Sequence, residues 1–227
     1  MVSMQTFKTR HEWLEARQGR IGGSDAAAIL GLHPSRTNVQ LWEEKTGRRQ
    51  PEDISSEPYV KYGIEAEPLL RELFKLDFPE YRMIYEENNM WINDNLPWCH
   101  ASLDGWLLDT SGNWGIWECK TTEIMRAGQK DQWKNQIPDN YYIQLIHYLA
   151  VTECDFAVLK GQLKFSIDGE MWLQTKHYRL EQPEVAEDIE FLQEKEYQFW
   201  QQVKNDTPPN LILTFFLLCH LIQVLVQ

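Results

Sequence analysis

The sequence predicts an α/β (α+β) protein, because segments with helix signals surround a central stretch with strand signals. Helix caps and glycine stops recur over the first 76 residues, and short apolar and aromatic runs separated by turn residues fill residues 82–122. A helix, two strands and a last helix follow. The 227 residues are 43% apolar and 12% aromatic, which is enough to bury a full core. We therefore expect one domain over residues 1–207 and a separate apolar tail over residues 208–227.

Four helices are expected in the first third of the chain. Thr9 can cap the first helix and Gly19 can end it. The second should open at Gly22-Gly23-Ser24-Asp25, with Ser24 as its N-cap, and the third should follow Thr37-Asn38. A polar loop over residues 48–57 separates these from a long fourth helix. The expected helices cover residues 10–18, 25–30, 38–46 and 59–76.

Strand signals dominate the middle of the chain. Turn residues at 88–89, 93–95 and 111–113 divide the apolar runs between residues 82 and 122, which predicts a strand meander. Pro138 begins a helix, two strands at 155–165 and 171–179 flank Asp168-Gly169, and an acidic helix runs from about Pro183 to Lys204. Residues 211–227 carry no formal charge but fall short of the ~20 residues that span a bilayer. A buried terminal helix is therefore favoured over a membrane anchor.

Charge and cysteine usage limit the function classes. The chain has 34 acidic and 22 basic residues, and its net charge of −12 argues against indiscriminate binding to nucleic acid or anionic lipid. Residues 1–50 are an exception, with eight basic and five acidic residues. The four cysteines show no close pairing, so we expect reduced thiols in a cytoplasmic protein. Because ligand spacing is absent, a zinc site at Cys99-His100 and Cys119 is less favoured than core packing.

The stretch that carries chemistry is Ser102-Leu103-Asp104-Gly105, followed by Glu118-Cys119-Lys120. Alternate residues of a strand share a face, so Glu118 and Lys120 should point together while Cys119 points away. A hairpin closed at residues 111–113 would bring Asp104 beside them. Converging carboxylates repel one another, and a hard divalent cation such as Mg²⁺ relieves that repulsion and promotes phosphodiester hydrolysis. For Glu118 and Lys120 taken alone, a surface ion pair is the alternative.

Further motifs point to a known family. The chain contains, in order, I-G-G-S-D-A-A-A-I-L-G, G-I-E-A-E-P, S-L-D-G, E-C-K-T and Y-Y-I-Q-L-I-H-Y-L-A-V-T. Over about residues 10–165 this set resembles the YqaJ-like viral recombinase or lambda exonuclease family of the PD-(D/E)xK nuclease superfamily. The resemblance implies a restriction-endonuclease-like core, with a central mixed sheet flanked by helices. It also implies a nuclease site that uses Mg²⁺, with Mn²⁺ as a substitute.

The resemblance assigns catalytic roles by position to Asp104, Glu118, Lys120, Glu67 and Gln144. The first two would be the metal-binding carboxylates, Lys120 the catalytic lysine and Glu67 the helical acid, with Glu65 as a competing acid. Gln144 matches a supporting glutamine, and ordinary helix packing is the alternative for it. Leu103 stands where the superfamily motif has a proline. This departure from the motif casts little doubt on the metal site.

The resemblance also implies how a DNA end is bound. In the lambda-type enzymes an arginine seven residues before the matching serine holds the 5′-phosphate. The same spacing selects Arg17 with Ser24 in this sequence, and Arg20 is a nearby second candidate. Unpaired N–H groups at the start of a helix favour an anion there, although Ser24 also fits a plain N-cap. We therefore expect an exodeoxyribonuclease that degrades 5′-phosphorylated strands of linear duplex DNA and leaves 3′ overhangs for recombination.

The expected partners are double-stranded DNA ends, a single-strand annealing protein and two further copies in a homotrimer, inside a bacterial cell that carries a phage or prophage. Two alternatives stay open: a Mg²⁺-dependent endonuclease without end preference, and a catalytically silent scaffold that binds DNA ends. A nuclease with an iron–sulfur cluster is disfavoured, because the four cysteines lack the spacing that such a cluster needs.

Overall fold

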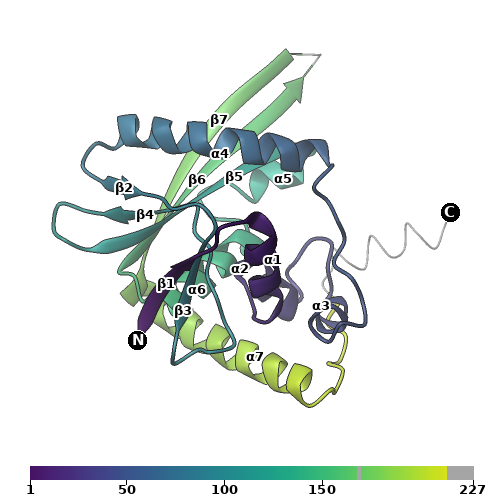
Figure 1. The fold of residues 1–227 in the computed structure, drawn as a ribbon. Coiled ribbons are helices and arrows are strands. Elements are labelled where there is room, and N and C mark those ends of the chain that lie inside the picture. Colours follow the sequence, from purple (N-terminus) through teal and green to yellow (C-terminus); the bar gives the residue numbers. More distant parts are fainter. Residues whose placement is uncertain (168–169, 214–227) are drawn as a thin grey trace.

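A mixed five-stranded sheet forms the centre of the computed structural model, which describes residues 1–167 and 170–213 (Figure 1). Its strand order is β2-β4-β5-β6-β7. Strands β5 and β6 are parallel, and the other neighbours in the sheet are antiparallel. The strands are β2 (Arg82–Ile84), β4 (Gly105–Leu108), β5 (Trp114–Ile124), β6 (Phe156–Ile167) and β7 (Glu170–Glu181).

Helices cover both faces of this sheet. One face carries α4 (Pro58–Asp77), and the other carries α6 (Asp139–Thr152), against which α2 (Gly23–Ile29) and α7 (Ala186–Lys204) pack (Figure 1). The fold-class prediction, a mixed sheet flanked by helices, is therefore confirmed. The remaining helical elements are α1 (Arg10–Gln18), α3 (Asn38–Lys45), α5 (Ala127–Asp131) and a 3₁₀ turn (Gln182–Val185).

Alternation along β5 divides the core into two parts. Trp117 is fully buried against Phe74 of α4, with ring centroids 5.8 Å apart, whereas the neighbouring Ile116 belongs to the apolar cluster built by α6. By the same alternation Cys119 packs under α4. Glu118 points to the α6 side, where it contacts a side chain of that helix.

The expected helix positions agree with the structure, apart from the start of α2. Gly22 is the N-cap residue of α2 and Gly23 is already its first helical residue, so the prediction that Ser24 is the N-cap is wrong. The reason is the side chain of Asp25, whose Oδ2 accepts a hydrogen bond from the Gly22 N–H at 3.0 Å. A carboxylate at the third helical position satisfies the cap from inside the helix.

Two strands outside the main sheet interrupt the predicted meander. Strand β3 (Asn89–Asn93) pairs with β1 (Val2–Thr6) and lies outside the sheet that holds β2 and β4. The meander prediction is therefore wrong for β3, while β2, β4 and β5 follow one another as expected. β1 is almost entirely exposed, and only Val2 and Met4 of its five residues are apolar, which is too short an alternation to reveal a strand.

The beginning of the C-terminal tail contacts α3. The Asn38 side-chain amide donates to the Asn210 carbonyl at 2.7 Å, and its oxygen accepts from the Ile212 N–H at 3.0 Å. The expected terminal helix, Cys219 and the turn at residues 168–169 lie outside the described residues. Cys99, Cys119 and Cys154 are free and buried, as expected for core cysteines. Among the described helices, none is long and apolar enough to cross a membrane.

Candidate active site

The hairpin of β4 and β5 brings the predicted acidic residues together. The two strands pair antiparallel with Gly105 opposite Trp117, so the predicted hairpin is confirmed. Asp104 immediately precedes β4, and its Oδ2 accepts a hydrogen bond from the Cys119 N–H at 3.0 Å. This bond holds the Asp104 carboxylate beside the segment of β5 that carries Glu118.

Glu118 is enclosed by the protein, with 2% of its surface exposed. Its Oε1 accepts hydrogen bonds from Lys120 Nζ at 2.6 Å and from Gln144 Nε2 at 2.8 Å. The Gln144 amide also donates to the Tyr148 hydroxyl at 2.8 Å. Glu118 Oε2 is buried and has no hydrogen-bond partner among the described residues. The pair of Glu118 and Lys120 is therefore no surface ion pair, and Gln144 does more than fill space in its helix.

Glu67 of α4 adds a third carboxylate. Together with Asp104, Glu118 and Lys120 it lines a cavity of about 440 Å³. Glu65, the competing acid, is exposed and does not line this cavity. Residues two apart on a helix point in different directions, which explains why one of the two reaches the cavity and the other does not.

Glu118 and Glu67 hold their protons more tightly than ordinary glutamates. Burial and the charge of Asp104 raise the pKa of Glu118 to about 8, and the same two causes raise the pKa of Glu67 to about 7. Burial alone would lower the pKa of Lys120, but Glu118 and Asp104 outweigh burial and raise it above its usual range. Fully ionised, the three carboxylates would carry more negative charge than Lys120 and Arg71, which pairs with Glu67, can neutralise.

This set of donors fits a hard divalent cation. Asp104, Glu118 and Glu67 offer carboxylate oxygens, the ligand type that Mg²⁺ and Mn²⁺ prefer in proteins. The buried and unpartnered Oε2 of Glu118 is an acceptor that lacks a donor within the described chain. A bound cation would satisfy it and would relieve the mutual repulsion of the acids.

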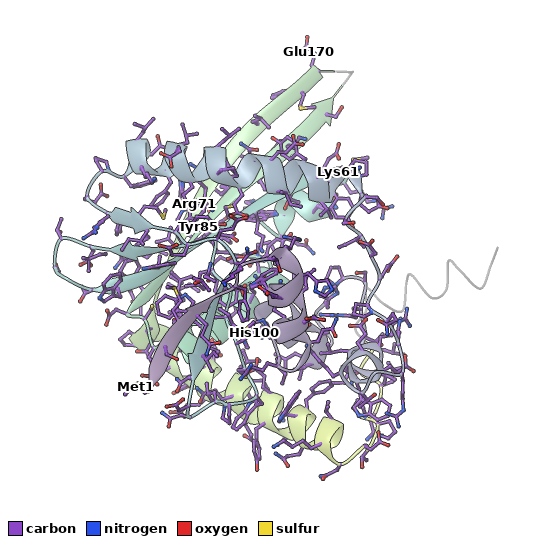
Figure 2. The ribbon with its side chains drawn as sticks, in the orientation of Figure 1. Met1, Lys61, Arg71, Tyr85, His100 and Glu170 are labelled. Carbon is purple, nitrogen blue, oxygen red and sulfur yellow. The ribbon has the colours of Figure 1, made fainter. Side chains whose placement is uncertain are left out.

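The sequence analysis missed two residues of the site, the basic Arg71 and the aromatic Tyr85. Arg71, one helical turn after Glu67, donates from Nε to the Asp104 carbonyl oxygen at 2.9 Å and lies over the ring of Tyr85, 3.5 Å from its centroid (Figure 2). Arg71 also pairs with the Glu67 carboxylate. The spacing of four residues on one predicted helix could have indicated an ion pair of Glu67 and Arg71, but not the contact of Arg71 with Asp104.

Arg17 lies between two cavities. Its guanidinium stacks over the Trp13 ring, 4.1 Å from the centroid, and lines the cavity of the three carboxylates. It also lines a neighbouring cavity of about 480 Å³ with Ser24 and His100. The structure thus brings Arg17 and Ser24 to one cavity, next to the acidic one. Arg20, the second candidate, has its Nε buried.

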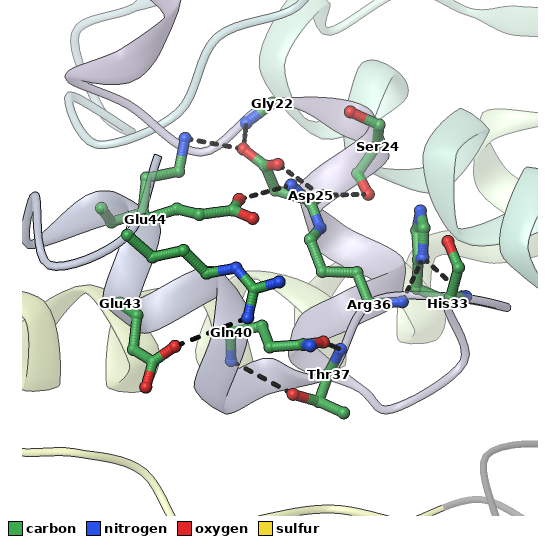
Figure 3. A network of polar contacts seen from close by, with 12 residues as sticks. Gly22, Ser24, Asp25, His33, Arg36, Thr37, Gln40, Glu43 and Glu44 are labelled. Carbon is green, nitrogen blue, oxygen red and sulfur yellow. Dashed lines mark hydrogen bonds and ion pairs between the residues drawn. The ribbon is translucent and has the colours of Figure 1, made fainter. Parts of the chain in front are cut away.

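A buried ionic network fixes the wall around Ser24 (Figure 3). Asp25 accepts from Lys45 Nζ at 2.8 Å and from Arg36 at 2.7 Å, and Arg36 also donates to the Ser24 carbonyl oxygen at 3.1 Å. Burial opposes the charged form of Asp25, yet Lys45 and Arg36 hold its pKa well below its usual range. The network therefore ties α2 to α3 and to the loop between them.

A second titratable cluster consists of Cys99, His147 and Glu196, all buried, whose potential ligand atoms lie within 4.8 Å of one another. His147 Nδ1 lies 2.6 Å from Glu196 Oε1, and Nε2 lies 2.8 Å from the His100 carbonyl oxygen. Cys99 donates its thiol to Glu196 Oε2 at 3.3 Å. Both ring nitrogens thus face acceptors, so the arrangement is that of an imidazolium paired with a carboxylate, without a free nitrogen for a metal.

The comparisons with known proteins show the family of this chain. The model of the YqaJ-like viral recombinase domain matches residues 12–155. The uncharacterized protein YqaJ of Bacillus subtilis (strain 168) is 30% identical over 171 residues, which cover 73% of this chain and 51% of that protein. The chain therefore spans about half the length of this relative.

Solved structures of two exonucleases share the fold. The alkaline exonuclease LHK-Exo from Laribacter hongkongensis superposes with a TM-score of 0.60 and 17% identity, over 86% of this chain and 93% of that one. A phage related exonuclease from Haemophilus somnus 129PT gives 0.53 and 13% identity, over 82% and 96% of the two chains. At such identities the likeness establishes the fold. With the family match over more than half of its length, the chain belongs to the YqaJ-like viral recombinase family.

Proposed function

We propose that the protein is a Mg²⁺-dependent exodeoxyribonuclease that hydrolyses 5′-phosphorylated strands of linear duplex DNA and leaves 3′ overhangs for phage-type recombination. One observation carries this proposal: Asp104, Glu118 and Lys120 line one cavity, in which a buried Glu118 oxygen has no hydrogen-bond partner within residues 1–167 and 170–213. The family membership and the fold shared with exonucleases support it.

In this proposal Asp104 and Glu118 hold the cation, Mg²⁺ or in its place Mn²⁺, and Glu67 is the third acid. The cation would supply charge neutralisation on the phosphate and on the leaving oxygen. Lys120 is charged, because its pKa is raised, so its ammonium donates a hydrogen bond that orients the attacking water. Gln144 holds the Glu118 carboxylate in place through its amide.

Arg17 and Ser24 would bind the 5′-phosphate of the strand that is degraded. The cavity that they share adjoins the acidic cavity, and Arg17 lines both. A guanidinium stacked on an aromatic ring keeps its N–H groups available at its edges, where a phosphate can accept two of them. We further propose that the protein works as a homotrimer in a bacterial cytoplasm and passes the overhang to a single-strand annealing protein.

The test is a time course on linear and covalently closed duplex DNA, with Mg²⁺ and with EDTA. We expect the linear DNA to be degraded only with Mg²⁺, and Lys120→Ala to lose roughly 10²- to 10⁴-fold in rate while it still binds DNA ends. Lys75→Ala, which removes an exposed ion pair with Glu72, is the control. Equal cutting of both substrates would favour the endonuclease alternative, and no cutting by folded protein would favour the silent scaffold.

A further inference from the structure

Arg71 connects two of the three acidic segments of the site. Its side chain is 8% exposed, and it comes from α4, whereas Asp104 immediately precedes β4. Nε donates to the Asp104 carbonyl oxygen at 2.9 Å, and a terminal nitrogen pairs with Glu67 Oε1. One guanidinium therefore holds the backbone at one acid and the carboxylate of another.

The Tyr85 ring fixes the plane of this guanidinium. The Arg71 carbon Cζ lies 3.5 Å from the ring centroid. Tyr85 directly follows β2, the strand next to β4 (Figure 1). A stacked guanidinium can donate only in its own plane, so its two contacts have defined directions. A lysine ammonium at this position carries the same charge but has one nitrogen and no plane.

We propose that Arg71 is a positioning residue that sets Glu67 relative to Asp104, so that the carboxylates are arranged for a divalent cation before the cation binds. The inference rests on the proposed function, because it assumes that these acids form the cation site. Partners that orient metal-binding carboxylates act in this way in other metal sites, where their loss weakens metal affinity or activity by roughly 10- to 100-fold.

A role of Arg71 through its charge and a role in positioning the acids predict different Mg²⁺ affinities for the same variants. These variants therefore separate the inference from simpler roles of Arg71. If Arg71 acted only through its positive charge, Arg71→Lys would leave the Mg²⁺ affinity unchanged and Arg71→Met would increase it, since a competing cation is lost. If Arg71 positions the acids, Arg71→Lys weakens Mg²⁺ binding although the net charge is conserved. A role in folding alone would lower the melting temperature without an effect on Mg²⁺ affinity.

The experiment is calorimetric titration of Mg²⁺ into the full chain without DNA, with thermal melting of each variant as a check on folding. For Arg71→Lys we expect a Mg²⁺ dissociation constant roughly 10- to 100-fold larger than that of the wild type. Tyr85→Leu should weaken Mg²⁺ binding in the same direction, whereas Tyr85→Phe, which keeps the ring, should bind like the wild type. Lys75→Gln, on the exposed side of the same helix, is the matched control.

Nuclease assays over a Mg²⁺ series add a second measurement. For Arg71→Lys we expect the half-saturating Mg²⁺ concentration to rise while KM for DNA ends stays unchanged, because Arg17 and Ser24 are untouched. An unchanged Mg²⁺ affinity in Arg71→Lys would overturn the inference, as would equal affinities of Tyr85→Leu and Tyr85→Phe. Wild-type protein that binds Mg²⁺ but cleaves no DNA would instead refute the proposed function and leave the calorimetric result to decide on Arg71.

Discussion

At the scale of a single residue, the pKa of Glu118 shows the repulsion between the carboxylates of the site. Burial and Asp104 move its pKa from an ordinary value of 4.5 to about 8, although Lys120 lies 2.6 Å from its Oε1. Lys120 pairs with Glu118 and Arg71 pairs with Glu67, but burial and the charge of Asp104 outweigh these cations at both acids. The folded protein without a cation therefore favours a protonated Glu118 at neutral pH, whereas the unfolded chain releases that proton.

This difference predicts that the metal-free protein loses stability as the pH rises from about 4.5 to about 8. In that window the folded state binds more protons than the unfolded state, so the free energy of unfolding falls with increasing pH. Glu118→Gln removes the titrating group, and we expect its urea midpoint in EDTA to depend less on pH. Glu67 adds a slope of the same sign to both proteins. Parallel pH profiles would show that Glu118 ionises normally.

Local geometry predicted Asp104, Glu118 and Lys120, whereas Glu67 and Gln144 were assigned only by the family resemblance. Alternation along one strand places Glu118 with Lys120, and a short hairpin adds Asp104, so no distant contact was needed. Arg71 was missed because its role depends on a contact across the fold, from a helix to the Asp104 backbone. Its spacing from Glu67 suggests only an ordinary ion pair on a helix surface.

At the scale of elements, α6 links the candidate active site to the packing of α7. Gln144 on this helix donates to Glu118, and His147, three residues later, pairs with Glu196 of α7 and with the His100 carbonyl oxygen. His100 in turn lines the cavity that holds Arg17 and Ser24. The position of α6 thus affects both cavities.

We expect the buried pair of His147 and Glu196 to be strongly coupled. Glu196→Gln leaves an imidazolium without its counter-charge, which should destabilise the protein by about 3–5 kcal/mol in urea unfolding. The double variant His147→Leu/Glu196→Met removes both charges and should cost less than Glu196→Gln alone. A double-mutant cycle with His147→Leu and Glu196→Met as single variants measures the coupling. If the two losses of stability simply add, the two side chains do not interact.

Elements with strong local patterns were predicted and weakly patterned ones were not. Helix α4 has a long apolar period and its bounds match the expected residues 59–76 closely, and β5 begins directly after the predicted turn at residues 111–113. Strand β1 exists because it pairs with β3, more than 80 residues away in the sequence, and α5 has only five residues. Pairing over such a distance and a single helical turn leave no period to detect.

The charge distribution is a property of the whole molecule. The net charge of −12 contrasts with the basic excess of residues 1–50, which supply Arg17, Arg36 and Lys45 to the cavity with Ser24. Arg36 and Lys45 are paired with Asp25 in this cavity. Arg17, which has no ion pair among the described residues, is therefore the cation left to attract a terminal phosphate. Composition alone could show this asymmetry, but only the fold shows that the basic residues converge on one cavity beside the acids.

This arrangement predicts a preference for ends that carry a 5′-phosphate. Arg17 would make charge-assisted hydrogen bonds of ~1.5–3 kcal/mol, so a phosphorylated end should be degraded roughly ten- to a hundredfold faster than a hydroxyl end. Arg17→Ala should reduce this ratio, as measured by initial rates on two duplexes that differ only in the terminal phosphate. Arg48→Ala, which removes an exposed pair with Asp206, should keep the ratio. Equal rates of the wild type on both duplexes would refute the role of Arg17 and Ser24 and leave the metal-dependent nuclease in place, because the acids lie in the adjoining cavity.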